Sequence, residues 1–391
     1  MKRQYYLDQI AFHFKIHSVV GLLGPRQVGK TTLAKEYAKQ FNSVHFFDLE
    51  NPFDVSRLEN AMLTLQSIEA DLIVIDEIQL RPELFPILRV LVDEKPRKFL
   101  ILGSASPSTS FRLHVKFRRT CRAGLIQQSS ETLAGRIGYI ELPPFSIEET
   151  HEIHQLWIRG GFPRSYLAAS EKESVAWRQA YISTFMERDI PNLGFNIPLM
   201  LMKRLWMMLA HYHGNILNAS EIGNSLDLTH HTVRKYIDIL AGTFMIRYLQ
   251  PWFENISKRQ VKSPKVYIRD SGLLHTLLNI PTFDDLLIYP RLGASWEGFA
   301  LEEIIKQYHM QTDECYFWST QGGAELDLFF IKDGKRLGFE FKYTDTPRVT
   351  KSMHIALEDL KLDHLYVVHP HKQTFPLSSN ITAIALQNIR G

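Results

Sequence analysis

The sequence contains little cysteine and no long apolar run. Its 391 residues include two cysteines, Cys121 and Cys315, which lie far apart. Two isolated thiols provide neither a disulfide framework nor the closely spaced ligands of a zinc site, so a reducing, cytoplasmic setting is expected. No stretch of about 18 uncharged apolar residues is present, and the N-terminal segment lacks the apolar core of a signal peptide. We therefore predict a protein with no transmembrane helix and no membrane partner.

Charge of one sign is not in excess either. The chain carries 45 Lys and Arg residues against 42 Asp and Glu residues, a formal net charge of +3. Such a small excess does not by itself indicate a nucleic-acid partner, although clustered basic residues would permit one.

The length predicts two or three domains, and the 45% of hydrophobic residues suffices for ordinary cores. Repeats and low-complexity tracts are not evident, so we expect a globular multidomain protein.

The most informative stretch is a glycine-rich loop between a predicted strand and a predicted helix. Residues 19–32 read VVGLLGPRQVGKTT and contain a full match to G-x-x-x-x-G-K-[ST]. The two glycines of this motif let backbone N–H groups point at phosphate oxygens, the lysine adds a positive charge, and the hydroxyl residue is a ligand for Mg²⁺. The helix that begins here directs its positive end at the same anion. We predict that ATP contacts Gly24, Pro25, Arg26, Gln27, Val28, Gly29, Lys30, Thr31 and Thr32.

A second motif follows the buried run LIVI at 72–75. Asp76 and Glu77 come directly after this predicted strand. Asp76 and Thr31 are expected to hold Mg²⁺, while Glu77 orients or deprotonates the attacking water. Lys30 and Glu77 are therefore the predicted catalytic residues of ATP hydrolysis. A solvated strand end is the alternative for an isolated acidic pair, and the upstream loop argues against it.

Further apolar runs indicate a parallel sheet covered on both faces. They lie at residues 44–49, 72–75, 99–102 and 139–142. Ser104 follows the third run and is a candidate sensor of the γ-phosphate, with an ordinary turn serine as the alternative. Arg136 precedes the fourth run and is a candidate to contact nucleotide in its own chain or in a neighbouring chain. A homo-oligomer is left open.

Six motifs in this order make the chain resemble prokaryotic AAA-family ATPases that carry a C-terminal nuclease-like domain. They are GPRQVGKTTLAK, LIVIDEIQ, GSAS, LAGRIGYIEL, Gly160-Gly161-Phe162-Pro163 and Glu187-Arg188-Asp189-Ile190. The resemblance implies a lid over the nucleotide after residue 147 and a place for Arg188 near an ATP site. The connection after GSAS is short in the family pattern, whereas here it contains the basic segment 111–125. This segment is read either as a nucleic-acid contact or as a solvated hairpin.

The middle of the chain contains three short helical patterns. They cover residues 201–212, 219–226 and 229–241. Asn218 and Thr229 stand where N-caps are expected, and the third helix leaves Arg234 and Lys235 off its apolar face. This pattern, with a strand at 244–249, is typical of a winged helix-turn-helix. DNA is therefore an expected partner, and packing against other domains is the alternative.

The last third contains a predicted hairpin with acids on both strands. Its strands, 324–331 and 336–343, flank a turn at Asp333-Gly334, a pair that favours a type I′ turn with a two-residue loop. This loop fixes the register, in which each pair of residue numbers sums to 667. Asp327 then faces Glu340 on one side of the sheet.

Facing carboxylates repel each other unless something positive lies between them. A divalent metal, Mg²⁺ or Mn²⁺, would meet this need, held by Asp327, Glu340 and Glu297 from the predicted helix 296–307. Lys342 is the predicted catalytic lysine beside it. Asp327 followed by Glu340-x-Lys342 also resembles the PD-(D/E)XK nuclease core, with Glu297 matching its helical acid. The alternative is a surface hairpin whose acids are solvated, and whether the site cuts is a separate question.

Together these features predict an α/β protein with three sections. They are a P-loop AAA-type ATPase core with a parallel sheet (1–146), a helical lid and winged helix-turn-helix section (147–255), and an α/β PD-(D/E)XK nuclease-like domain (256–391). The predicted function is a Mg²⁺-dependent ATPase that couples ATP binding and hydrolysis to a DNA-binding, nuclease-like region. The alternative is a nucleotide-gated adaptor that binds DNA or protein and has an inactive nuclease-like domain.

Overall fold

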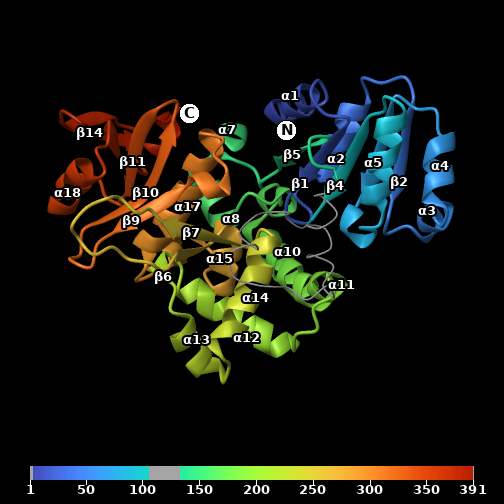
Figure 1. Ribbon diagram of the computed structural model, residues 1–391. Coiled ribbons are helices and arrows are strands. Elements are labelled where there is room, and N and C mark those ends of the chain that lie inside the picture. Colours follow the sequence, from blue (N-terminus) through green and yellow to red (C-terminus); the bar gives the residue numbers. More distant parts are fainter. Residues whose placement is uncertain (1–2, 105–132, 391) are drawn as a thin grey trace. The chain divides into compact units, whose positions relative to one another are not determined.

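The computed structural model describes residues 3–104 and 133–390 (Figure 1). The basic segment 111–125 and Cys121 lie outside these residues, so what the sequence predicts for them stays a prediction. The chain divides into two compact units. Unit 1 consists of Met1–Pro144, Ser183–Leu199 and Asp238–Phe244, and unit 2 consists of Phe145–Ile182, Met200–Ile237 and Met245–Gly391. In the part of the chain that the structure describes, no helix is both long and apolar enough to cross a bilayer.

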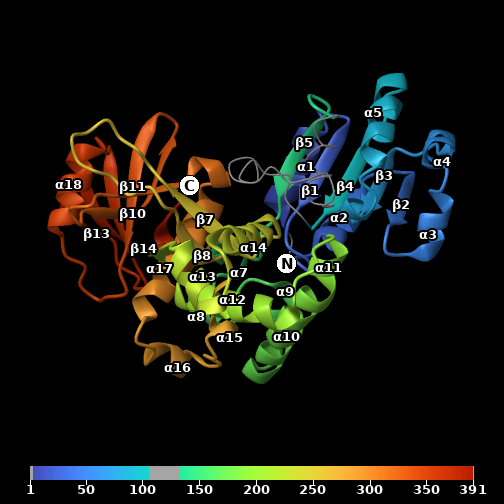
Figure 2. The ribbon, with the colours of Figure 1, turned by 60° about the horizontal axis from the view of Figure 1, so that its bottom comes forward.

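Unit 1 is built on a five-stranded parallel sheet with the order β2-β3-β4-β1-β5, which can be followed from strand to strand in Figure 2. Its strands are β1 (Val19–Leu23), β2 (Val44–Asp48), β3 (Leu72–Asp76), β4 (Phe99–Gly103) and β5 (Ile137–Glu141). Its helices are α1 (Gln4–His13), α2 (Lys30–Ala38), α3 (Pro52–Arg57), α4 (Ala61–Ser67), α5 (Leu84–Glu94) and α11 (Ile190–Asn192). A 3₁₀ turn at Ile78–Leu80 and a π-helical turn at Phe185–Asp189 complete these elements. The predicted strand before the glycine-rich loop and the four further strand predictions are all confirmed.

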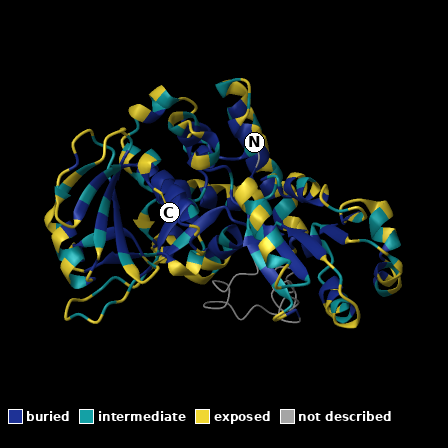
Figure 3. Cartoon of the chain, turned by 90° about the horizontal axis from the view of Figure 1, so that it is seen from above, coloured by how far each residue is buried: buried dark blue, intermediate teal, exposed yellow. Residues whose placement is uncertain are grey.

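The central strands of unit 1, β1, β3 and β4, are apolar and buried on both sides because both faces of the sheet are covered there. Helices α1 and α2 share one core with alternate strand residues such as Val20 and Leu100. The intervening residues, such as Ile73 and Ile101, are also fully buried. Figure 3 shows the strands of this sheet as largely buried. Parallel strands of this kind end at one common edge, which brings the loops after β1, β3 and β4 together.

Unit 2 contains a nine-stranded mixed sheet with the order β13-β14-β12-β11-β10-β9-β7-β8-β6. Its strands are β6 (Asn215–Ile216), β7 (Ile246–Pro251), β8 (Lys265–Ile268), β9 (Tyr316–Ser319), β10 (Glu325–Lys332), β11 (Lys335–Phe341), β12 (His364–His369), β13 (Phe375–Ser378) and β14 (Ile381–Ala385). β7 pairs with β8, so this sheet crosses the predicted section limit at residue 255. The predicted middle and C-terminal sections therefore share one sheet.

The helices of unit 2 cover this sheet and form the helical section. They are α7 (Ile147–Thr150), α8 (Ile153–Arg159), α9 (Pro163–Tyr166), α13 (Ala219–Leu226), α15 (Ser271–Leu277), α16 (Phe283–Leu287), α17 (Leu292–Gln307) and α18 (Lys351–Asp359). Most of α10 (Glu171–Thr184), α12 (Leu199–His211) and α14 (His230–Gly242) also belongs to this unit. Helix α17 packs in one core with Phe317 and Phe339, and α18 packs in a second core with Leu326 and Leu365.

The hairpin of β10 and β11 has the register that the sequence predicts. Its paired residues run from Lys332 and Lys335 to Leu328 and Phe339, and each pair of numbers sums to 667. Both central turn residues, Asp333 and Gly334, have positive φ values of 50° and 76°, as a type I′ turn requires. This prediction is confirmed.

Candidate functional site

The glycine-rich loop connects β1 to α2, which begins at Lys30. A Cβ atom on Gly24 would lie 2.3 Å from the carbonyl oxygen of Leu142, so a side chain does not fit there. Gly29 has a φ of +99°, in the left-handed region that favours glycine. Both motif glycines are thus required by the local backbone. Thr31 and Thr32 follow in the first turn of α2, where the positive end of the helix dipole lies.

The ammonium group of Lys30 is buried inside this loop. Its Nζ donates hydrogen bonds to the carbonyl oxygens of Gly24 and Pro25, each at 3.0 Å. Burial lowers the pKa of Lys30, against the opposing effect of the Glu77 and Asp76 carboxylates. These bonded partners are neutral carbonyls, so the positive charge remains available to an anion in the loop.

Thr31 and Asp76 meet as the sequence predicts. The Thr31 hydroxyl donates to Oδ2 of Asp76 at 2.6 Å, and the other carboxylate oxygen accepts from the backbone N–H of Glu77 at 2.9 Å. Burial raises the pKa of Asp76, and the hydrogen bond from Thr31 opposes this rise. A hydroxyl and a carboxylate side by side are hard oxygen ligands of the kind that Mg²⁺ prefers. The donor set therefore fits this ion.

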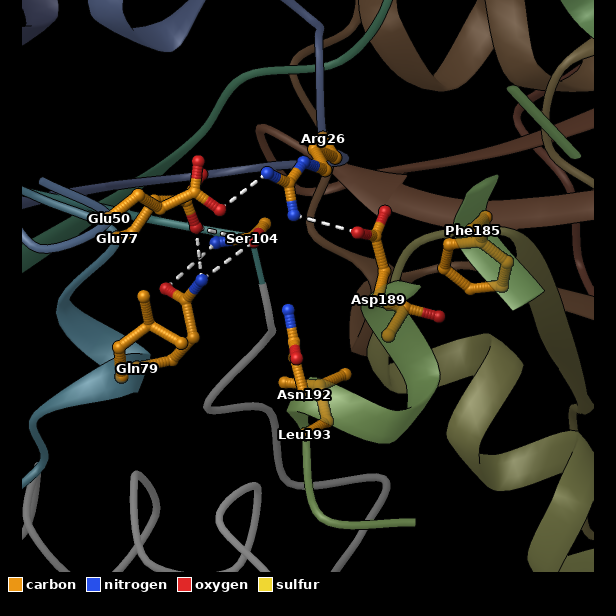
Figure 4. Close-up of a pocket in the computed structure, with 11 residues that line it drawn as sticks. Arg26, Glu50, Glu77, Gln79, Ser104, Phe185, Asp189, Asn192 and Leu193 are labelled. Carbon is orange, nitrogen blue, oxygen red and sulfur yellow. Dashed lines mark hydrogen bonds and ion pairs between the residues drawn. The ribbon is translucent and has the colours of Figure 1, made fainter. Parts of the chain in front are cut away.

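Glu77 is held by two neighbours, Gln79 from the 3₁₀ turn after β3 and Ser104 directly after β4 (Figure 4). The Ser104 hydroxyl donates to Oε2 of Glu77 at 2.9 Å, and the amide of Gln79 donates to the same oxygen. Gln79 also donates to the Ser104 hydroxyl at 2.8 Å. The sequence motif places Ser104 here, but it assigns no role to Gln79, which is buried. Gln79 contacts both the Glu77 carboxylate and the Ser104 hydroxyl because β3 and β4 are neighbours in the sheet, and the sequence alone does not show this pairing.

Arg26 occupies the pocket shown in Figure 4. Its guanidinium contacts Glu50 at 2.6 Å and Asp189 at 2.7 Å. Although burial opposes it, these carboxylates, Asp189 first, raise the pKa of Arg26. Arg188, singled out by its motif, is half exposed and contacts Asp189 at 3.5 Å. Sequence reasoning offered Asp189 only as a local ion-pair partner of Arg188 and gave Glu50 no role, because nothing in the sequence shows that these acids reach the loop. The pocket is lined by Arg26, Glu50, Glu77, Gln79, Leu80, Ser104, Phe185, Asp189, Asn192, Leu193 and Thr243.

Arg136 lies away from the phosphate loop of its own chain. It immediately precedes β5, and its carbonyl oxygen accepts from the N–H of Val19 at the start of β1. Because these strands are parallel, this is the edge opposite the loop, about 15 Å away along a five-residue strand. The Arg136 side chain pairs instead with Asp93, at 2.7 and 3.0 Å. This position does not fit contact with nucleotide in its own chain, whereas contact with a neighbouring chain's nucleotide stays a prediction, with an ordinary surface ion pair as the alternative.

The acids of the C-terminal hairpin form part of an acidic cluster, which we define as Glu297, Glu325, Asp327 and Glu340. The lysine of β8, Lys265, lies within it. Its Nζ is 3.3 Å from Oε1 of Glu297 and 3.4 Å from Oδ1 of Asp327, and it also contacts Oε1 of Glu325. The positive charge that the facing acids need is thus an ammonium group of the same chain. Sequence reasoning read Lys265 as part of a basic run beside the helix-turn-helix and did not place it in this cluster, because it lies 62 residues before Asp327.

The predicted metal ligands do not form a metal site in this arrangement. Within residues 3–104 and 133–390, no group of three or more His, Cys, Asp or Glu side chains is placed to hold a metal ion. This differs from the expected set of Glu297, Asp327 and Glu340, and the physical reason is the lysine among them. The predicted catalytic lysine, Lys342, pairs with Oε2 of Glu340 at 2.9 Å.

The titration behaviour of this cluster reflects its burial. Burial raises the pKa of Glu340 to about 8, with a further rise from the nearby Asp327. Burial also raises the pKa of Glu297. For Lys265, burial acts in the opposite direction, but Tyr267, Glu297 and Asp327 raise its pKa well above its usual range. Lys265 is therefore charged at any ordinary pH.

The predicted helix-turn-helix elements are present. Helices α12 and α13 lie side by side in both Figures 1 and 2, and Asn218 caps α13 by accepting from the N–H of Glu221. Thr229 accepts from the N–H of Thr232 at the start of α14. Both N-cap predictions are confirmed. His230, His231, Arg234 and Lys235 are exposed on α14, whereas Val233, Ile237 and Leu240 are fully buried.

Comparison with known proteins separates the chain into three matched regions. Residues 17–151 match an AAA domain, and residues 150–284 and 292–389 match two domains of unknown function, DUF8612 and DUF4143. The AAA match and the loop geometry identify an ATPase-like domain of the P-loop type. The Walker-type ATPase PABY2304 of Pyrococcus abyssi has a TM-score of 0.47 and 14% identity, covering 71% of this chain and 95% of that one. Because this score is below 0.5, the fold assignment rests on the strand order and the AAA match.

Two mycobacterial proteins are similar over almost the entire chain. They are the uncharacterized proteins Mb2031c of Mycobacterium bovis and Rv2008c of Mycobacterium tuberculosis, each 46% identical over 375 residues. The match covers 95% of this chain and 80% of each relative. The chain therefore belongs to the same family as these two uncharacterized mycobacterial proteins.

Proposed function

We propose that this chain is a Mg²⁺-dependent ATP hydrolase whose nucleotide state is coupled to a DNA-binding, nuclease-like C-terminal region. The observation that carries the hydrolase is the 2.6 Å hydrogen bond between Thr31 and Asp76. It joins the phosphate loop after β1 to the acidic strand end of β3. A hydroxyl and a carboxylate in this position are what Mg²⁺ on a nucleotide needs.

Each residue of the site then has a defined task. Lys30 pairs with the β- and γ-phosphates, and Thr31 and Asp76 hold Mg²⁺, which neutralises charge on the phosphate oxygens when it is bound. Glu77 orients the attacking water and accepts its proton. Ser104 and Gln79 fix the Glu77 carboxylate through their hydrogen bonds.

ATP binding and turnover by the purified full-length protein test this proposal. Lys30→Ala removes the phosphate charge, so ATP affinity should fall at least about tenfold, equivalent to about 1.4 kcal/mol. Lys35→Ala is the matched control, because Lys35 is an exposed lysine of the same helix. Equal ATP affinity in the parent and both variants would contradict the proposal.

The proposed DNA contact is supported by the exposed basic residues of α14. Charge reversal at Arg234 and Lys235 should weaken DNA binding and flatten its salt dependence, because each phosphate contact contributes about 0.9 to the slope of log K against log salt. Charge reversal at Lys351 and Lys361 is the control, since both are exposed lysines of unit 2. Unchanged binding in the α14 variant would exclude α14 as the contact surface.

A second candidate is a nucleotide-gated adaptor that binds DNA or protein and hydrolyses ATP slowly. The ion pair between Arg26 and Asp189 favours it, because this pair connects the phosphate loop to a segment 163 residues away. A bound phosphate would compete with Asp189 for Arg26. ATP turnover measured with and without DNA separates the candidates, because a coupled hydrolase is stimulated by DNA and a gated adaptor is not.

A further inference from the structure

The acidic cluster of unit 2 is a set of carboxylates that already have protein partners. Oε1 of Glu297 accepts from the Tyr267 hydroxyl at 2.6 Å as well as from Lys265. Oδ2 of Asp327 accepts from the backbone N–H of Phe341 at 3.1 Å, while Oδ1 faces Lys265. Both oxygens of Asp327 and one oxygen of Glu297 therefore already have protein partners.

The Lys265 ammonium is fixed in this position. Only 4% of its side chain is exposed, and its Nζ lies 5.6 Å from the centre of the Phe317 ring. Its backbone belongs to β8, where it pairs with Leu249 on β7 and Ile216 on β6. The backbone of Lys265 is therefore held on both sides, and only rotation of its buried side chain could remove the ammonium group from the acids.

An ammonium group and a divalent cation cannot share this space. Mg²⁺ and Mn²⁺ require about six oxygen ligands at close to 2.1 Å, whereas the Lys265 nitrogen already lies within 3.4 Å of two of the carboxylates. A second cation would meet the first one at close range, beside a lysine side chain that is only 4% exposed, so solvent would screen little of the repulsion. Binding of a metal would require expulsion of the lysine.

We propose that Lys265 is a built-in cation that takes the place of the divalent metal in the acidic cluster. The nuclease-like region then binds no divalent metal at these acids, and it performs no metal-dependent strand cleavage there. The acids and lysines of this cluster instead form ion pairs with one another within the folded domain. This inference does not depend on the proposed ATP hydrolysis, because the two sites use different residues.

The test is Mn²⁺ binding to the full-length protein without nucleotide, measured by titration calorimetry and by electron paramagnetic resonance. We expect the parent protein to bind no Mn²⁺ at the acidic cluster. Asp327→Asn should therefore leave Mn²⁺ binding as it is in the parent. Lys265→Met removes the ammonium at nearly constant volume and should increase the Mn²⁺ affinity at least tenfold. This gain should disappear when Asp327→Asn is added.

Lys335→Met is the matched control, because Lys335 begins β11 at the turn of the same hairpin and its side chain is exposed. It should behave as the parent does. A parent protein that binds Mn²⁺ through Asp327 would overturn the proposal, as would a folded Lys265→Met variant without a gain in affinity. If Lys265→Met does not fold, the melting temperatures of the parent and of Asp327→Asn are compared in Mn²⁺ and in chelator. The two proteins should show the same change in melting temperature. A melting temperature that Mn²⁺ raises in the parent alone would be contrary to the proposal.

Discussion

The molecule contains two buried lysines beside acidic residues, and their surroundings differ. In unit 1, Lys30 donates to two backbone carbonyls, and burial lowers its pKa. In unit 2, Lys265 contacts three carboxylates, and their charges outweigh burial and raise its pKa. Residue type and burial are the same at both positions.

The difference shows how a buried lysine acquires its role. Lys30 donates only to neutral carbonyls, so its charge remains available to an anion in the loop, and Asp76 lies beside the Thr31 hydroxyl as a second oxygen ligand for a metal. Lys265 has charged partners, so its charge is already neutralised. The first arrangement suits a ligand site, whereas the second is a closed structural network.

The largest effect is expected from removing Glu77, the proposed catalytic carboxylate of the first site. Glu77→Gln should lower the ATP turnover rate at least about 100-fold, because general-base catalysis typically contributes a factor of that size. Nucleotide binding should persist, since Lys30 is intact. Glu325→Gln in the acidic cluster is the control for the comparison and should turn over ATP at the parent rate. Steady-state hydrolysis together with equilibrium ATP binding checks both statements.

The two lysines should also differ in their contribution to stability. Lys265→Met leaves buried carboxylates without a counter-charge, and it should lower the free energy of unfolding by about 3–5 kcal/mol. Lys30→Met removes a buried charge from neutral partners, and it should cost no more than about 1.5 kcal/mol. Urea denaturation of the two variants provides the measurement. Equal decreases in the free energy of unfolding for the two variants would contradict the proposed difference between the two lysine environments.

A smaller effect is expected at Gln79, which positions Glu77 without contacting nucleotide in the proposed mechanism. Gln79→Leu removes its hydrogen bonds to Glu77 and Ser104, so kcat should fall about tenfold, in line with the 1.5–3 kcal/mol of a hydrogen bond to a charged group. KM should stay close to the parent value. Gln66→Leu, at an exposed glutamine of α4, should leave both constants unchanged. A rise in KM with unaltered kcat would show that Gln79 acts on binding instead.

Local patterns in the sequence predicted much of this molecule. The phosphate loop, the strands of unit 1, the N-caps at Asn218 and Thr229, and the hairpin register of β10 and β11 each follow from a few neighbouring residues. In all of these, the geometry is set by backbone conformation and side-chain spacing within about ten residues.

Contacts between distant segments could not be predicted in the same way. Lys265 reaches Asp327 across 62 residues, and Gln79 reaches Ser104 across 25, because the strand order brings them together. The position of Arg136 depends on which edge of the sheet it occupies, and this follows only from the parallel pairing of β5 with β1. Sequence reasoning found the acids of the C-terminal cluster and the need for a positive charge, but not the source of that charge.

The most direct test counts the Mn²⁺ ions bound per chain, with and without a non-hydrolysable ATP analogue. Mn²⁺ replaces Mg²⁺ at nucleotide sites and is detected by electron paramagnetic resonance. The two lysine environments predict one bound Mn²⁺ ion per chain when the analogue is present and no bound ion when the analogue is absent. In Lys30→Ala, the ion that binds with the analogue should be lost. A metal ion that binds without nucleotide and is lost in Asp327→Asn would contradict this account.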